Sequence, residues 1–176
     1  MTGRLAVRAA AFWCVVFSLV AMLAAGCGKD RNMQPTITLA EATERVERSL
    51  RDAAAQLPAG AELKREGPDE PLPCEGAGGM DTGQVFMERS YHVIHPEPWP
   101  TDQLIEILDR YWKSQGFRVL RDDRGDRLPA TLVVRDSANQ VDVAIDLYHR
   151  GGGSIDAYLV ADSDCIWPDG TLSPRS

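Results

Sequence analysis

The sequence predicts an α+β fold, in which an antiparallel sheet of about five to six strands carries two helices packed on one face. Two segments, 38–57 and 101–116, repeat apolar residues at intervals of three and four, as amphipathic helices do. Elsewhere, short runs alternate apolar and polar residues, which is typical of strands with one buried face. Because short turns join the strands after residue 117, neighbouring strands should be antiparallel, and residues 38–170 should form a single domain.

The first helix begins with a capping box, in which Thr38 precedes Glu41 by three residues. We expect it to end at Pro58, since proline cannot continue a helix. Its opposite face is charged and should contact either solvent or a partner. The apolar positions are Leu39, Ala42, Val46, Leu50, Ala53 and Leu57.

The middle of the chain alternates strand and loop signals. Residues 61–66 and 84–94 are predicted strands, and 67–83, rich in proline and glycine, is a predicted long loop. The three prolines within 95–100 predict a stiff extended turn. Trp99 in this turn is a candidate partner contact, because exposed tryptophan is frequent at binding hot spots.

Thr101 is the expected cap of the second helix, and Gly116 its end. Four strands should follow, joined by a charged turn over 122–127, a turn over 137–140 and the three glycines 151–153. Their expected bounds are 117–121, 130–135, 141–148 and 154–160.

The N-terminus has the composition of an export signal. Arg4 and Arg8 precede an uncharged apolar run, 9–25, that falls short of the roughly 20 residues a spanning helix needs. We therefore predict a signal peptide over 1–26, a polar tether over 27–37 and a disordered tail over 171–176. An uncleaved transmembrane anchor is the alternative.

The segment Leu23–Cys27, Leu-Ala-Ala-Gly-Cys, resembles the lipobox of bacterial prolipoproteins, although Ala24 stands where leucine is usual. The resemblance implies cleavage before Cys27, a diacylglyceryl group on its sulfur, and a cell membrane location on the extracytoplasmic face. Two or three acyl chains hold firmly, whereas one is marginal. The segment Cys165–Gly170 is similar to one in small LppA-like lipoproteins of high-GC Gram-positive bacteria, a group that implies no activity.

The remaining cysteines support export. Cys14 would leave with the signal and Cys27 would be acylated, which leaves Cys74 and Cys165 as an even pair in an oxidising compartment. We expect a disulfide between them, with two buried free thiols as the alternative. Neither cysteine has a second ligand at metal-binding spacing.

The charge of the chain limits its partners. The formal net charge is −7, and removal of Arg4 and Arg8 would make it more negative. Nucleic acid and anionic lipid surfaces both need local positive charge, so neither is an expected partner. The membrane should be contacted through the lipid alone, and an envelope protein is the expected partner.

One acidic cluster could bind a cation. A hairpin turning at 151–153 would place Asp146 opposite Asp156, with Asp142 two residues along the strand. Opposed like charges are destabilising and need compensation. Ca²⁺ is a weak candidate for this role, and Arg135 across from Asp142 is the alternative.

No catalytic arrangement emerges. Asp81-Thr82-Gly83 matches the aspartic-protease tripeptide once rather than twice, and Arg124-Gly125-Asp126 is a chance match to an integrin-recognition tripeptide. His92 and His95 should face opposite sides of an extended segment. We therefore expect no catalysis and no cofactor. An interaction or accessory module is the favoured function, with a small-ligand carrier and an envelope hydrolase as alternatives.

Overall fold

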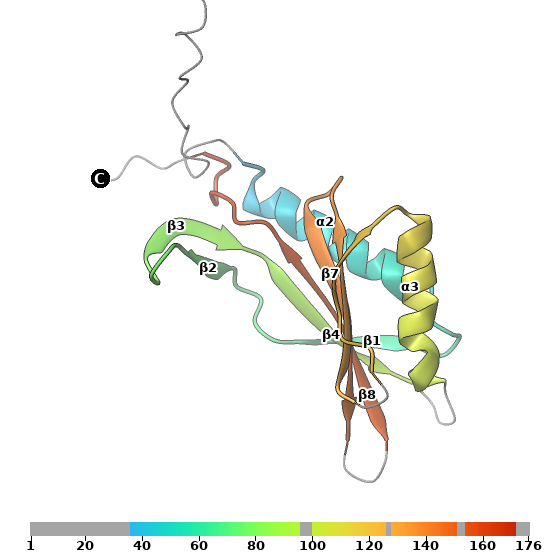
Figure 1. The fold of residues 1–176 in the computed structure, drawn as a ribbon. Helices are drawn as coiled ribbons and strands as arrows, with labels where there is room; N and C mark the ends of the chain where they lie inside the picture. Colours follow the sequence, from blue (N-terminus) through green and yellow to red (C-terminus); the bar gives the residue numbers. More distant parts are fainter. Residues whose placement is uncertain (1–35, 96–99, 126–127, 151–153, 172–176) are drawn as a thin grey trace, which may run out of the picture. The chain divides into compact units, whose positions relative to one another are not determined.

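The computed structural model describes residues 36–95, 100–125, 128–150 and 154–171, and Figure 1 shows their arrangement. Residues Gln34–Ser176 form one compact unit. The main sheet has six strands, all antiparallel, in the order β1-β4-β8-β7-β6-β5. A second sheet contains β2 and β3. The predicted α+β class and strand number are therefore confirmed.

The strand bounds follow the alternation of the sequence closely in the second half of the chain. There, β8 is longer than expected, since it continues to Ser163 and pairs with β7 along its whole length. The strands are β1 Glu62–Glu66, β2 Leu72–Glu75, β3 Asp81–Phe86, β4 Glu88–Ile94, β5 Arg118–Asp122, β6 Ala130–Asp136, β7 Val141–His149 and β8 Ile155–Ser163.

Helix α2, Leu39–Ala54, begins with the predicted capping box. The Thr38 hydroxyl accepts from the Glu41 amide, and the Glu41 carboxylate accepts from the Thr38 amide. The helix ends earlier than Pro58, because the amides of Gln56 and Leu57 bond three residues back in a tighter turn.

Helix α3, Leu104–Ser114, follows a short 3₁₀ turn over Thr101–Gln103. The expectation that Thr101 caps this helix is wrong, since Gln103 holds the cap position and the Thr101 hydroxyl lies 3.3 Å from His95 Nε2. The predicted end is right: Gly116 has a φ of +77° and lets the Phe117 amide reach back to the Trp112 carbonyl.

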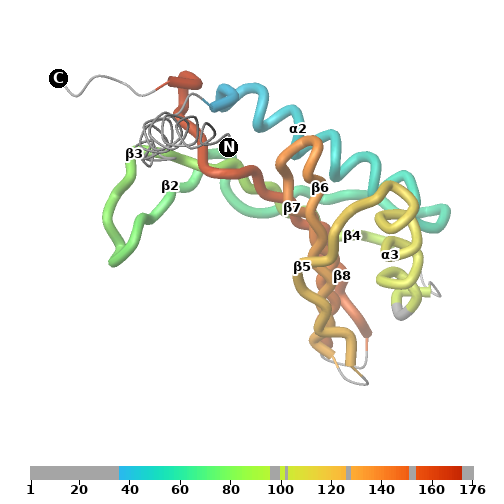
Figure 2. The backbone as a smooth tube through the Cα atoms, turned by 45° about the horizontal axis from the view of Figure 1, so that its top comes forward, coloured from blue at the N-terminus to red at the C-terminus, as the bar shows by residue number. Residues whose placement is uncertain are grey.

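Both helices cover the same face of the main sheet, as Figures 1 and 2 show. The inward side chains of β6, β7 and β8 are buried at alternate positions, while the intervening ones stay partly exposed. Trp112 and Leu108 of α3 and Leu50 of α2 fill the space between the layers. One sheet face is thus buried, and the other remains open to solvent.

Residues 67–83 are not the loop that their prolines and glycines predict. They contain β2 and the start of β3, which pair as a hairpin. Pro73 is tolerated because β2 has a single neighbour and its missing amide breaks no second ladder. The predicted strand 84–94 is correspondingly divided at Met87 into the end of β3 and the whole of β4.

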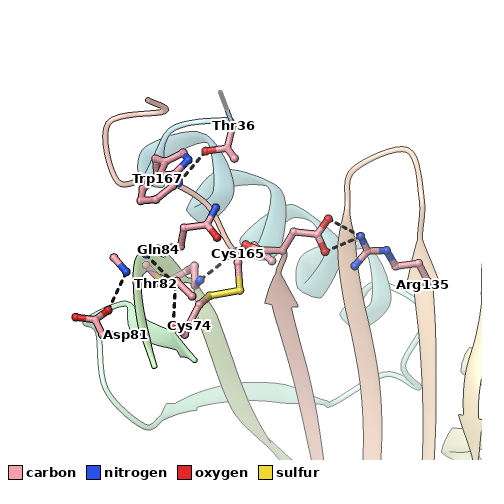
Figure 3. Close-up of a disulfide and its surroundings, with 12 residues drawn as sticks. Thr36, Cys74, Asp81, Thr82, Gln84, Arg135, Cys165 and Trp167 are labelled. Carbon is pink, nitrogen blue, oxygen red and sulfur yellow. Dashed lines mark hydrogen bonds and ion pairs between the residues drawn. A yellow bond between two sulfur atoms is a disulfide. The ribbon is translucent and has the colours of Figure 1, made fainter. Parts of the chain in front are cut away.

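A disulfide joins this hairpin to the segment that follows β8. Cys74 and Cys165 are bonded, as the sequence predicts, and close a separation of 91 residues (Figure 3). Next to it, Val85 and Ile166 exchange two backbone hydrogen bonds. The buried Trp167 ring lies against Gly83, whose φ of +73° favours glycine.

The same C-terminal segment holds the start of the domain. The Thr36 amide donates to the Gly170 carbonyl, the Trp167 amide to the Thr36 hydroxyl, and the Leu39 amide to the Pro168 carbonyl. We call residues 36–38 and 165–170 the terminal clamp. A side chain at Gly170 would approach the Thr36 carbonyl oxygen to 3.1 Å, and this tight contact together with a φ of +76° favours glycine. The last two residues of the predicted tether are therefore part of the folded domain.

We expect the double substitution Cys74→Ala, Cys165→Ala to lower the free energy of unfolding by about 2–4 kcal/mol, because the disulfide restricts a long loop in the unfolded chain. Urea unfolding followed by circular dichroism measures the loss. The unsubstituted chain in excess dithiothreitol should lose a similar amount. An unchanged midpoint in both samples would contradict this role for the disulfide.

Candidate functional site

The candidate site is the open face of the main sheet, which lies opposite the two helices. We define it by the alternate side chains of four strands that the helices leave uncovered. Almost all of them are partly exposed, in contrast to their buried sequence neighbours. They are Glu88, Ser90, His92 and Ile94 of β4; Asp156, Tyr158, Val160 and Asp162 of β8; Asp142, Ala144, Asp146 and Tyr148 of β7; and Thr131, Val133 and Arg135 of β6.

The strand registers arrange these side chains in rows across the sheet. One row runs from Ser90 through Val160 and Ala144 to Val133. It is mostly apolar and lies in the middle of the open face. An apolar strip with polar rows on both sides is the usual composition of a protein-binding surface.

The neighbouring row, which begins two residues earlier in β4 at Glu88, is charged. Glu88 pairs with Asp162, Asp162 with Asp142, and Asp142 with Arg135. Arg135 forms ion pairs with Asp142 at 2.9 Å and with Asp164 at 2.7 Å. The predicted compensation of Asp142 by Arg135 is therefore confirmed.

Asp162 sits between two acidic neighbours in this charged row. Burial, together with the charges of Glu88 and Asp142, raises the pKa of Asp162 to about 6, and Arg135 only partly opposes this effect. The carboxyl group is thus ionised at a free-energy cost at neutral pH. A partner that places a cation here would remove that cost.

A third row, on the other side of the apolar row, contains His92, Tyr158, Asp146 and Thr131. The expected pairing of Asp146 with Asp156 is wrong. Asp146 lies opposite Tyr158, and Asp156 opposite Tyr148, so the two carboxylates do not face one another. The register differs by two residues because Arg150 faces Ser154 across the turn, whereas an Asp146–Asp156 pair would have placed Arg150 opposite residue 152. Asp146 instead accepts a 2.6 Å hydrogen bond from the Thr131 hydroxyl.

This register also separates the weak cation candidates Asp142, Asp146 and Asp156 into three different rows. Within the part of the chain that the structure describes, no three histidine, cysteine, aspartate or glutamate side chains gather as metal ligands. The acidic pair that does form, Asp142 with Asp162, was not expected.

His92 belongs to the third row and contacts Asp156 of a fourth row, which contains Asp156 and Tyr148. Its ring stacks on Tyr158 with centroids 4.8 Å apart, its Nε2 lies 3.3 Å from Asp156, and its Nδ1 lies 3.9 Å from Glu66. Asp156 belongs to β8 and Glu66 to β1, so both carboxylates are distant from His92 in the sequence. The contacts of His92 with these carboxylates could not be predicted from residue spacing, because other strands supply them.

Two motifs of the sequence have structural roles. Asp81 accepts from the Gly83 amide and Thr82 donates to the Cys74 carbonyl, so the Asp81–Gly83 tripeptide stabilises the β2–β3 hairpin. The Arg124 guanidinium bonds Asp122 and the buried Asp109. Although burial acts to raise the pKa of Asp109, hydrogen bonds from Lys113 and Arg124 lower it. Arg124 is thus engaged within the domain.

The lipidation residue Cys27 and the candidate partner contact Trp99 lie outside the described residues. So do the predicted signal peptide and most of the tether and tail. Neither α2 nor α3, the helices of the described region, is long and apolar enough to span a membrane.

Comparisons with known proteins give no family. No protein-family model, no curated protein and no solved structure matches the chain.

We expect Asp162→Asn to stabilise the protein by about 1–2 kcal/mol at pH 7.5 and to have no such effect near pH 4. The folded-state pKa lies above the unfolded value of 3.8, so the stabilisation from a protonated Asp162 is present at low pH and lost as the pH rises through about 6. Asparagine is uncharged at every pH, so the variant avoids the cost of ionising residue 162 at pH 7.5.

Urea unfolding at both pH values measures this difference. Asp52→Asn, on the exposed face of α2, is the matched control and should show a smaller difference between the two pH values, because this side chain is exposed to solvent. Equal effects of Asp162→Asn at pH 4 and pH 7.5 would contradict the assigned electrostatic cost.

Proposed function

We propose that this chain is a lipid-anchored lipoprotein of the bacterial cell envelope whose folded domain acts as a non-catalytic interaction or accessory module. The observation that carries the proposal is the open face, where an apolar row lies between two polar rows. The anchor rests on the signal-like N-terminus and on the lipobox resemblance at Cys27.

The terminal clamp supports an anchored arrangement. If Cys27 carries acyl chains, residues 28–35 are the only chain between the lipid and Thr36, which the domain holds through Gly170 and Trp167. Eight residues reach at most about 28 Å when fully extended. The domain would then remain close to the membrane, with room to turn and meet a neighbouring protein.

The disulfide supports an extracytoplasmic location. Disulfides persist in oxidising compartments and are rare in the reducing cytosol. Cys74 and Cys165 join the two-stranded hairpin to the C-terminal segment. Loss of this bond in a reducing compartment would weaken the hairpin next to the clamp.

The contacts of the histidines do not by themselves indicate hydrolysis. His92 contacts the carboxylates of Asp156 and Glu66, which can orient an imidazole but supply no hydroxyl or thiol nucleophile. The Thr101 hydroxyl that meets His95 is itself buried, and a buried hydroxyl is poorly placed to attack a substrate. These contacts lend no support to the envelope hydrolase.

A small-ligand carrier is the second candidate function. Bulky side chains such as Trp112, Leu108 and Leu50 fill the space between the helices and the sheet, so a ligand would need another site. The observation that favours a carrier is a cleft of about 300 Å³ at one end of the sheet. Its volume is at the lower limit for small-molecule sites.

We expect Cys27→Ala to move the protein from the membrane fraction to the soluble extracytoplasmic fraction, because the substitution removes the sulfur that would be acylated. Fractionation and immunoblotting measure the distribution. Replacement of Cys14, the other cysteine of the N-terminal segment, is the control and should leave the protein bound. Retention of Cys27→Ala in the membrane would favour an uncleaved apolar anchor.

We expect a photo-crosslinking residue at Tyr148, on the open face, to give one discrete cross-linked envelope protein in living cells. The same residue at Arg110, on the exposed side of α3, is the control and should not give this product. Adding Ala144→Arg in the apolar row should remove the product without lowering the melting temperature. Equal labelling from both positions would contradict docking on the open face.

A further inference from the structure

The main sheet opens into a fork at one end. The β4–β8 ladder stops at the pair His92 and Tyr158. Beyond it, β4 continues in its ladder with β1 as far as Ile94, and β8 begins earlier in its ladder with β7, at Ile155. Two strands in the middle of the sheet therefore diverge, although each remains paired on its other side.

The space between the diverging strands is the cleft of about 300 Å³. His92 and His95 both line it. His92 stacks on Tyr158 on the open face, whereas His95, just beyond the end of β4, lies beside the buried Thr101 hydroxyl that precedes α3. The full lining is His92, Val93, Ile94, His95, Arg150, Ser154, Ile155 and Asp156.

Asp156 organises the polar side of the cleft. A single carboxylate oxygen, Oδ1, lies 3.3 Å from His92 Nε2 and 3.5 Å from Arg150 Nη1. Asp156 therefore holds an imidazole and a guanidinium at the same wall. Its negative charge is shared between these two partners, and its side chain is largely buried.

The groups that remain for a ligand are mainly hydrogen-bond donors. The Arg150 side chain is 65% exposed and meets Asp156 through one nitrogen, so other N–H groups of its guanidinium can contact a ligand. Ser154, whose carbonyl accepts a hydrogen bond from the Arg150 amide, also lines the cleft. Lys64, opposite His92 in the β1–β4 ladder, adds positive charge nearby, and Glu66 opposes it.

We propose that this cleft binds a small anion that carries a carboxylate or phosphate group, held by a bidentate contact to Arg150. Two parallel N–H groups of a guanidinium can donate to two oxygens of either a carboxylate or a phosphate, which makes the contact strong and directional. The volume admits inorganic phosphate or a dicarboxylate of a few carbons. This binding site does not require the lipid anchor, and it shares His92, Ile94 and Asp156 with one end of the open face.

Isothermal titration of the whole chain, purified in a neutral detergent, with inorganic phosphate and separately with succinate tests the proposal. We expect saturable binding of at least one probe, and the preferred probe identifies the anion class. Arg150→Gln should weaken binding at least tenfold, while Arg118→Gln, at an exposed arginine of β5 remote from the cleft, should leave it unchanged.

Ser154→Trp provides a second variant, since an indole at this exposed lining position would fill the cleft. It should abolish binding and leave the circular dichroism melting curve unchanged. Absence of saturable binding for both probes, full binding by Arg150→Gln, or equal weakening by Arg118→Gln would overturn the proposal.

Discussion

The burial of a single face of the sheet is the constraint on which the rest of the structure depends. Buried apolar residues occupy alternate positions along β6, β7 and β8, with mostly polar residues between them, and the buried set packs against α2 and α3. A shift of one residue in any of these strands would move its apolar side chains into solvent. The registers are therefore strongly determined, and they also fix the rows on the open face.

Those rows give the open face its chemistry. Glu88, Asp162 and Asp142 lie side by side on three strands, and Arg135 balances only one end of the row. Such an arrangement reduces stability at neutral pH. Destabilising charge clusters of this kind often occur at binding sites, because a positive charge on the partner offsets the repulsion among the carboxylates.

The terminal clamp and the disulfide connect three regions that are distant in sequence. The start of the domain, the β2–β3 hairpin and the segment after β8 meet around Trp167, as Figure 3 shows. The hairpin has little apolar core of its own, and small sheets are weakly stable alone. Covalent and backbone contacts with residues 165–170 supply the missing support.

The sequence by itself determined the α+β class, both helices, the capping box at Thr38 and the pairing of the two cysteines of the domain, because each depends on local periodicity or on composition. Tertiary structure decided the β2–β3 hairpin, the pairing of Asp142 with Asp162 and the meeting of His92 with Asp156. These features depend on strand registers and on partners far along the chain. Residue spacing predicts neither the registers nor these distant partners, because both depend on how the whole sheet packs.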